Sequence, residues 1–169
     1  MGTRLLKYFI FISLFFLPNN FYGNIFAGEH ALGSFNNPYP SATPQVMPDG
    51  WLIEVIKFNS NAWPVIKSEN QFNDPPSSGK KMAMVTVRVV NDSTSTQPNL
   101  IKAKKFSMVG SKKELYGDGC GVIPNELDKS LFFGGEGTGN VCFEVGESET
   151  DFLLVYEHKY NDYIFLKIE

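Results

Sequence analysis

Apolar and polar residues alternate most regularly between residues 83 and 90. Positions 83, 85, 87 and 89 hold alanine or valine, whereas Thr86 and Arg88 stand between them. Successive side chains of a β-strand point to opposite faces. The pattern therefore predicts a strand with one buried face.

Other short segments are rich in apolar, β-branched and aromatic residues and end at glycine, proline or asparagine. Their spacing matches the interval of about 8–12 residues between turns that is typical of sandwiches and barrels. No amphipathic helical stretch separates them, so the pattern predicts an all-β antiparallel fold. The predicted strands cover residues 43–47, 51–58, 105–109, 114–116, 131–133, 140–145, 152–157 and 162–168.

Two segments interrupt this pattern. Residues 59–80 contain Pro64, Pro75 and Pro76, which predicts an irregular loop without a regular helix, and long loops are often functional. The glycine-rich run 134–139 lacks the spacing of a dinucleotide-binding or phosphate-binding loop. It predicts a flexible turn between strands.

The N-terminal residues have the order of an export signal. Arg4 and Lys7 precede an apolar run that ends at Pro18, as in signal peptides, and the run is shorter than the roughly 20 residues of a membrane-spanning helix. The sequence predicts a signal peptide over 1–27, a flexible lead-in over 28–42 and one domain over 43–169. The protein is then secreted or held at the cell surface, with no stable membrane span after cleavage.

The charge balance argues against nucleic-acid binding. The full chain has a formal net charge of −3, and loss of Arg4 and Lys7 with the signal makes the mature chain more acidic. Such a surface repels phosphate backbones. The one basic cluster, formed by Lys102, Lys104 and Lys105, is interpreted as the solvated flank of a strand.

Cys120 and Cys142 are the two cysteines of the chain. Two thiols downstream of an export signal indicate one structural disulfide. Free buried thiols and metal or redox ligands are the alternatives, but no CxxC motif occurs, and His30 and His158 are the only histidines. A zinc site therefore lacks support in the sequence.

Five motifs occur in order along the chain: DGW at 49–51, ENQFNDPP at 69–76, a strand ending in Asn91, CGVIP at 120–124 and GNVCFEV at 139–145. Together they resemble a known family, the secreted bacterial immunoglobulin-like domain of unknown function. This family occurs in exported proteins and lipoproteins and is similar in fold to a mycobacterial secreted antigen. The resemblance runs from about Asn37 to the C-terminus and implies an immunoglobulin-like antiparallel β-sandwich with Cys120 and Cys142 joined. It implies no known reaction.

Trp63 and Phe72 are candidates for partner contact, because both flank prolines in the long loop and loops on rigid scaffolds often carry recognition. The alternative is that these rings pin the loop to the core. His158 is interpreted as a solvated side chain. Acidic residues suggest a weak calcium site, since calcium takes oxygen ligands, with solvated turns as the alternative. These residues are Asp118, Asp128, Glu147, Glu149 and Asp151.

These observations favour an exported, non-enzymatic binding module for an unknown protein or cell-envelope component, with no required cofactor. A small-ligand or calcium-binding extracellular protein is the alternative. A cell-wall or glycan hydrolase ranks last, because the separation of a catalytic carboxylate pair is not readable from sequence.

Overall fold

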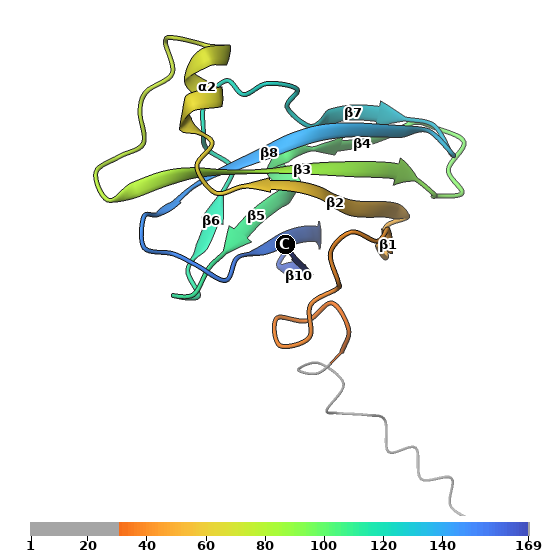
Figure 1. Ribbon diagram of the computed structural model, residues 1–169. Coiled ribbons are helices and arrows are strands. Elements are labelled where there is room, and N and C mark those ends of the chain that lie inside the picture. The colour runs from red at the N-terminus through yellow and green to blue at the C-terminus, as the bar shows by residue number, and fades with distance from the viewer. Residues whose placement is uncertain (1–30, 169) are drawn as a thin grey trace, which may run out of the picture.

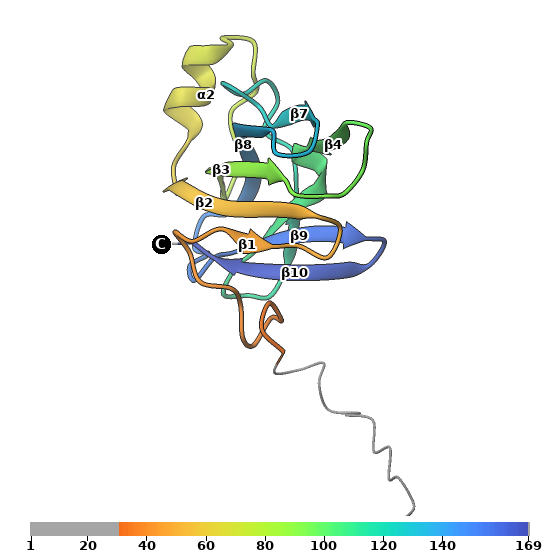
Figure 2. The ribbon, with the colours of Figure 1, turned by 90° about the vertical axis from the view of Figure 1, so that its right-hand side faces the viewer.

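The computed structural model describes residues 31–168, so the predicted signal peptide lies outside the described residues. Two antiparallel four-stranded sheets face one another (Figures 1 and 2). This arrangement confirms the predicted immunoglobulin-like antiparallel β-sandwich. One sheet has the order β1 (Gln45–Val46), β2 (Trp51–Asn59), β3 (Lys80–Asn91), β8 (Glu136–Gly146). The other has the order β10 (Asp162–Lys167), β9 (Leu153–Lys159), β5 (Phe106–Val109), β6 (Leu115–Gly117).

The hydrophobic core lies between the two sheets, and β3, the strand with the most regular alternation in the sequence, contributes one face to it. The alanine and valines at positions 83, 85, 87 and 89 of β3 are completely buried. Large side chains from the second sheet pack against them, including Phe106, Leu154 and Tyr156. Thr86 and Arg88 point to the other face and are partly exposed, as the alternation predicts.

A second, smaller apolar cluster covers part of the outer face of β3. Met82 and Met84 point away from the main core and are buried with Ala62 and Ile66. The outer face of this sheet is thus shielded where β3 begins, and α2 provides the cover (Figure 1).

The prediction that residues 59–80 contain no regular helix is wrong. Helix α2 spans Trp63–Glu69, with Pro64 in its first turn. Proline is tolerated there, because the amide hydrogen that it lacks would have no partner within the helix. Ile66, in the middle of this helix, is completely buried. Tertiary packing therefore stabilises a helix that is too short to be stable alone.

The prediction of a flexible turn over 134–139 is also wrong in part. Only the residues before Glu136 form the turn, and 136–139 already pair with β3. Glycine is required within this strand, because a Cβ on Gly139 would lie 2.7 Å from the Cα of Leu127. Glycine in a strand often marks such a close approach of another backbone.

Leu127 precedes a two-stranded sheet of β4 (Asn99–Lys102) and β7 (Asp128–Leu131). The predicted strand 131–133 lies too far along the chain, and β4 was not predicted. The 3-10 helix η1 (Ala103–Lys105) connects β4 to β5. Of the predicted basic cluster, Lys102 pairs with Asp128 at 3.0 Å, and Lys105 donates to the carbonyl of Glu157.

The described part of the lead-in is bonded to the sandwich. The amide of Tyr39 donates to the carbonyl of Phe165, and the amide of Phe165 donates to the carbonyl of Gly33. Residues 33–39 therefore form a turn whose two ends, Gly33 and Tyr39, both bond to Phe165 of β10. No helix among residues 31–168 has the length and apolar character needed to cross a membrane.

Candidate binding surface

The disulfide joins Cys120 to Cys142, with a Cα–Cα distance of 5.7 Å. Cys142 lies on β8, and Cys120 lies in the segment that follows β6. Both belong to the smaller cluster beneath α2, so the bond lies outside the sandwich core and not between the two sheets. It fastens the segment containing Cys120 to the outer face of β8.

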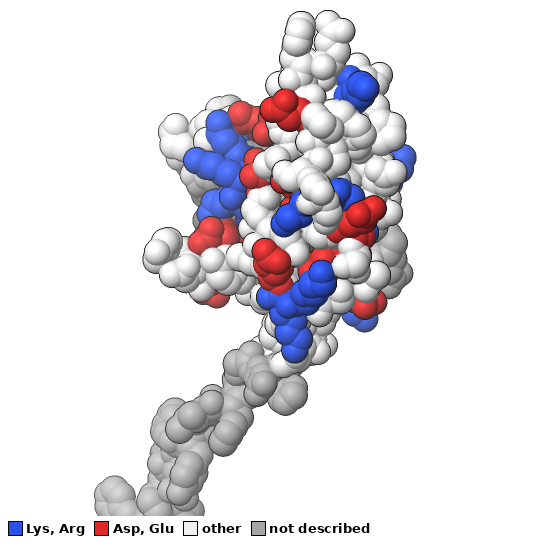
Figure 3. Space-filling view, turned by 90° about the vertical axis from the view of Figure 1, so that its left-hand side faces the viewer, with Lys and Arg blue, Asp and Glu red and all other residues white. Residues whose placement is uncertain are grey.

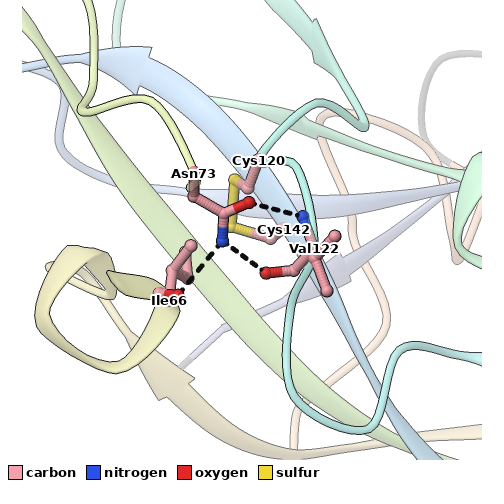
Figure 4. Close-up of a disulfide and its surroundings, with 5 residues drawn as sticks. All are labelled: Ile66, Asn73, Cys120, Val122 and Cys142. Carbon is pink, nitrogen blue, oxygen red and sulfur yellow. Dashed lines mark hydrogen bonds between the residues drawn. A yellow bond between two sulfur atoms is a disulfide. The ribbon is translucent and has the colours of Figure 1, made fainter. Parts of the chain in front are cut away.

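Asn73 fastens the loop after α2 to the same place (Figure 4). Its side-chain amide donates to the carbonyls of Ile66 and Val122, at 3.1 and 2.7 Å, and its Oδ1 accepts from the amide of Val122 at 2.9 Å. The side chain thereby bridges the end of α2 and the segment held by Cys120. We refer to residues 70–79 together with 119–123 as the disulfide-braced loop.

Gly121 allows this close contact. Its φ is +72°, and a Cβ added there would lie 2.6 Å from Oδ1 of Asn73. Both the left-handed backbone and the lack of space require glycine at this position. The two segments of the disulfide-braced loop, 70–79 and 119–123, are thus fixed relative to one another.

The two aromatic candidates for partner contact differ in their exposure to solvent. Trp63 is partly buried and packs against the cluster around the disulfide. Phe72 is 83% exposed and projects from the braced loop. It borders a cavity of about 300 Å³ that is also lined by Asp74 and Glu144. Sequence alone ranked the two rings equally, whereas burial leaves Phe72 as the one available to a partner.

Acidic and basic side chains are interspersed on the face that contains this end of the sandwich (Figure 3). Asp118 precedes the segment held by Cys120. Burial raises the pKa of Asp118, the nearby charge of Glu126 raises it further, and a bond from the amide of Gly119 partly opposes both effects. The surface suits a partner with mixed polar and apolar character more than a polymer of uniform charge.

The five carboxylates suggested as calcium ligands do not come together. Within residues 31–168, no group of three or more histidine, cysteine, aspartate or glutamate side chains is placed to hold a metal ion. Asp128 pairs with Lys102, and Glu147 and Asp151 are exposed.

Glu149 is instead a buried structural residue. Its carboxylate accepts from the Tyr116 hydroxyl at 2.9 Å, the Ser111 hydroxyl at 2.8 Å and the Lys112 amide at 3.0 Å. Burial alone would raise the pKa of Glu149, but these hydrogen bonds outweigh it and hold the pKa below its ordinary value. The network joins the β5–β6 turn to the β8–β9 turn. Gly110 leaves room for it, since a Cβ there would lie 2.5 Å from Oε2 of Glu149.

We predict that Glu149 makes stability depend on pH. A carboxyl group whose pKa is lower in the folded state stabilises the fold above its unfolded pKa, ordinarily 4.5, and this stabilisation is lost as the pH falls through the folded value. E149Q should have a lower melting temperature near neutral pH and a flatter profile in acid. Melting curves from about pH 7 to about pH 3 test this. E147Q, in the same turn but exposed, should behave like the wild type, and identical profiles for all three proteins would contradict the assignment.

The interpretation of His158 as solvated is wrong. Its side chain is only 6% exposed, and its Nε2 lies 2.9 Å from Oδ2 of Asp162. Two residues earlier on β9, the hydroxyl of Tyr156 donates to Asp49 at 2.7 Å. Burial raises the pKa of Tyr156, and the bond to Asp49 adds to the increase. The Tyr156–Asp49 bond connects β9 to the β1–β2 turn, and the His158–Asp162 contact connects the end of β9 to the start of β10.

Comparison with known proteins gives likeness in fold alone. No family model matches the chain, and no curated protein matches it. The secreted protein MPT63 of Mycobacterium tuberculosis superposes with a TM-score of 0.55 at 12% identity, over 78% of this chain and 97% of that one. A candidate lipoprotein of Bacillus subtilis, ycdA, superposes with a TM-score of 0.53 at 16% identity, over 76% of this chain. The match spans only 39% of the Bacillus protein. At these identities the likeness shows a shared β-sandwich fold.

Proposed function

We propose that this protein is an exported, non-enzymatic binding module that contacts a protein or cell-envelope partner through the disulfide-braced loop. The observation that carries the proposal is the exposure of Phe72 on a loop that is fixed from two sides. A ring exposed to this extent contributes little to the core and is free to contact a partner, and the loop that carries it is already ordered.

The construction of the loop supports the same role. A loop that is ordered before binding loses less conformational freedom when its partner arrives. The Asn73 hydrogen bonds and the disulfide supply that order. Exposed aromatic side chains on such surfaces commonly provide a large share of binding energy.

Secretion is supported by the order of residues in the predicted signal peptide. Likeness in fold to a protein described as secreted agrees with it. The buried carboxylate Glu149 and its partner Tyr116 bond to one another inside the fold, which supports a structural role for them over a catalytic one.

We predict that F72A weakens binding to the envelope of the cells that produce the protein by about tenfold or more, as for an interface hot spot. The melting temperature should stay within about 2 °C of the wild type, because an exposed ring stabilises the fold little. Quantitative binding of the labelled mature protein to intact cells, together with melting curves, gives both readings. Y160A is the matched control, because Tyr160 is 89% exposed but lies in the β9–β10 turn. Equal binding by F72A and Y160A would refute the assignment.

A further inference from the structure

The loop that leaves β3 and the turn that enters β8 meet at the other end of the sandwich (Figure 1). A groove is lined by side chains from both segments. It is open to solvent, has a volume of about 540 Å³ and is lined by Thr94, Ser95, Thr96, Phe132 and Phe133. β3 has 12 residues and begins beside the disulfide-braced loop. The groove is therefore about 35 Å from that loop, at the rise of an extended strand.

The Ser95 hydroxyl donates to the carbonyl of Gln97 and accepts from its amide, whereas the other four lining side chains are open to solvent. Phe132 and Phe133 are adjacent in sequence, and the side chain of each is exposed, at 64% for both residues. The hydroxyls of Thr94 and Thr96 are exposed and make no hydrogen bond with another described residue. Two solvent-exposed aromatic rings and two solvent-exposed hydroxyl groups therefore line the same groove.

Asn91 fixes the two walls relative to one another. This completely buried residue donates from its side-chain amide to the carbonyl of Leu131 at 2.7 Å and accepts from the amide of Ser93 at 3.1 Å. Its backbone bonds to Gly134 and Gly135 in the turn. The groove is consequently a formed feature of the fold and not a gap between independent loops.

The chemistry of the groove narrows the class of ligand. No charged residue occurs from Ser93 to Ile101 or from Ser130 to Gly135, so an ionic ligand would find no counter-charge in either wall. Hydrocarbon is also a poor fit, because insertion into a bilayer would leave the threonine hydroxyls without hydrogen-bond partners. A neutral saccharide fits both kinds of group, since each sugar ring has an apolar C–H face and a rim of hydroxyls.

We propose that this groove binds a neutral saccharide chain. Phe132 and Phe133 pack against the C–H faces of the sugar rings, and the hydroxyls of Thr94 and Thr96 form hydrogen bonds with sugar hydroxyls. The volume falls in the range of about 300–1,000 Å³ that is usual for ligand sites. The inference is independent of the proposed function, because the disulfide-braced loop contributes nothing to the groove.

Calorimetric titration of the mature protein with neutral hexasaccharides tests the proposal. The probes are the β-1,4-linked oligomers of glucose and of N-acetylglucosamine, the β-1,3-linked oligomer of glucose, and maltohexaose. At least one should bind, and the F132A/F133A double variant should bind it about tenfold more weakly through loss of the aromatic contacts. T94V/T96V removes both hydroxyls at nearly constant shape and should also weaken binding, by about fivefold. Both variants should melt within about 2 °C of the wild type, because the altered side chains are exposed.

F72A is the matched control and should bind the saccharide as the wild type does, which separates this site from the disulfide-braced loop. No heat change with any of the oligosaccharides at about 10 mM, a concentration that would reveal even a millimolar ligand, would overturn the proposal. Binding that survives F132A/F133A would overturn it as well. Two further outcomes would also reject it in favour of another occupant. One is binding to neutral phosphatidylcholine vesicles that needs the phenylalanines but not the threonines, and the other is self-association abolished by F132A/F133A.

Discussion

Replacing both Cys120 and Cys142 by alanine should lower the free energy of unfolding by about 3 kcal/mol, because the disulfide restricts the unfolded chain across a loop of this length. The two residues are separated by 22 positions. For a domain of this size the melting temperature should fall by roughly 10 °C. The disulfide-braced loop should also lose its order, since the segment that receives the Asn73 hydrogen bonds would no longer be fastened to β8.

Reductant provides the control for this prediction. Adding dithiothreitol should lower the melting temperature of the wild type toward that of the double variant and leave the variant unchanged. Backbone amide exchange of residues 70–79 should accelerate in the variant, while exchange in β2 and β9 under native conditions should keep its order of protection. A double variant as stable as the oxidised wild type would contradict the structural role assigned to the bond.

The second large effect is expected at Asn91. N91A should destabilise the protein by about 3 kcal/mol, because removing a buried amide leaves the Leu131 carbonyl and the Ser93 amide without partners. The Asn99 side chain, 3.4 Å from Oδ1 of Asn91, would lose an acceptor too. Denaturant unfolding measures the change. N36A is the matched control, since Asn36 is exposed, and it should stay within about 0.5 kcal/mol of the wild type. An equally small change in N91A would contradict the assignment.

The alternation of apolar and polar residues predicted the sandwich because burial on one face of a strand leaves a period of two in the sequence. It located β2, β3, β5, β9 and β10 to within a few residues of their observed bounds. It missed α2, because proline predicts a break in a helix interior but is tolerated in the first turn, where Pro64 lies. It also misread the start of β8, where glycine meets the neighbouring backbone and does not form a turn.

The residues that shape the two candidate sites were harder to predict. Asn73 bonds to Val122 across 49 positions of sequence, and Asn91 bonds to Leu131 across 40. Asparagine is common in turns, so neither residue stands out by type alone. Phe72 was selected by its place in the long loop, but its difference from Trp63 depends on burial, which only the folded chain determines.

Photo-crosslinking from position 72 tests the central claim most directly. Benzoylphenylalanine in place of Phe72 should crosslink the mature protein to one partner on intact cells of the source. The crosslink should be lost when Cys120 and Cys142 are both replaced, and the same probe in place of Tyr160 should give none. Crosslinking that is equal from both positions, or absent from position 72, would contradict the assignment of the disulfide-braced loop as the contact surface.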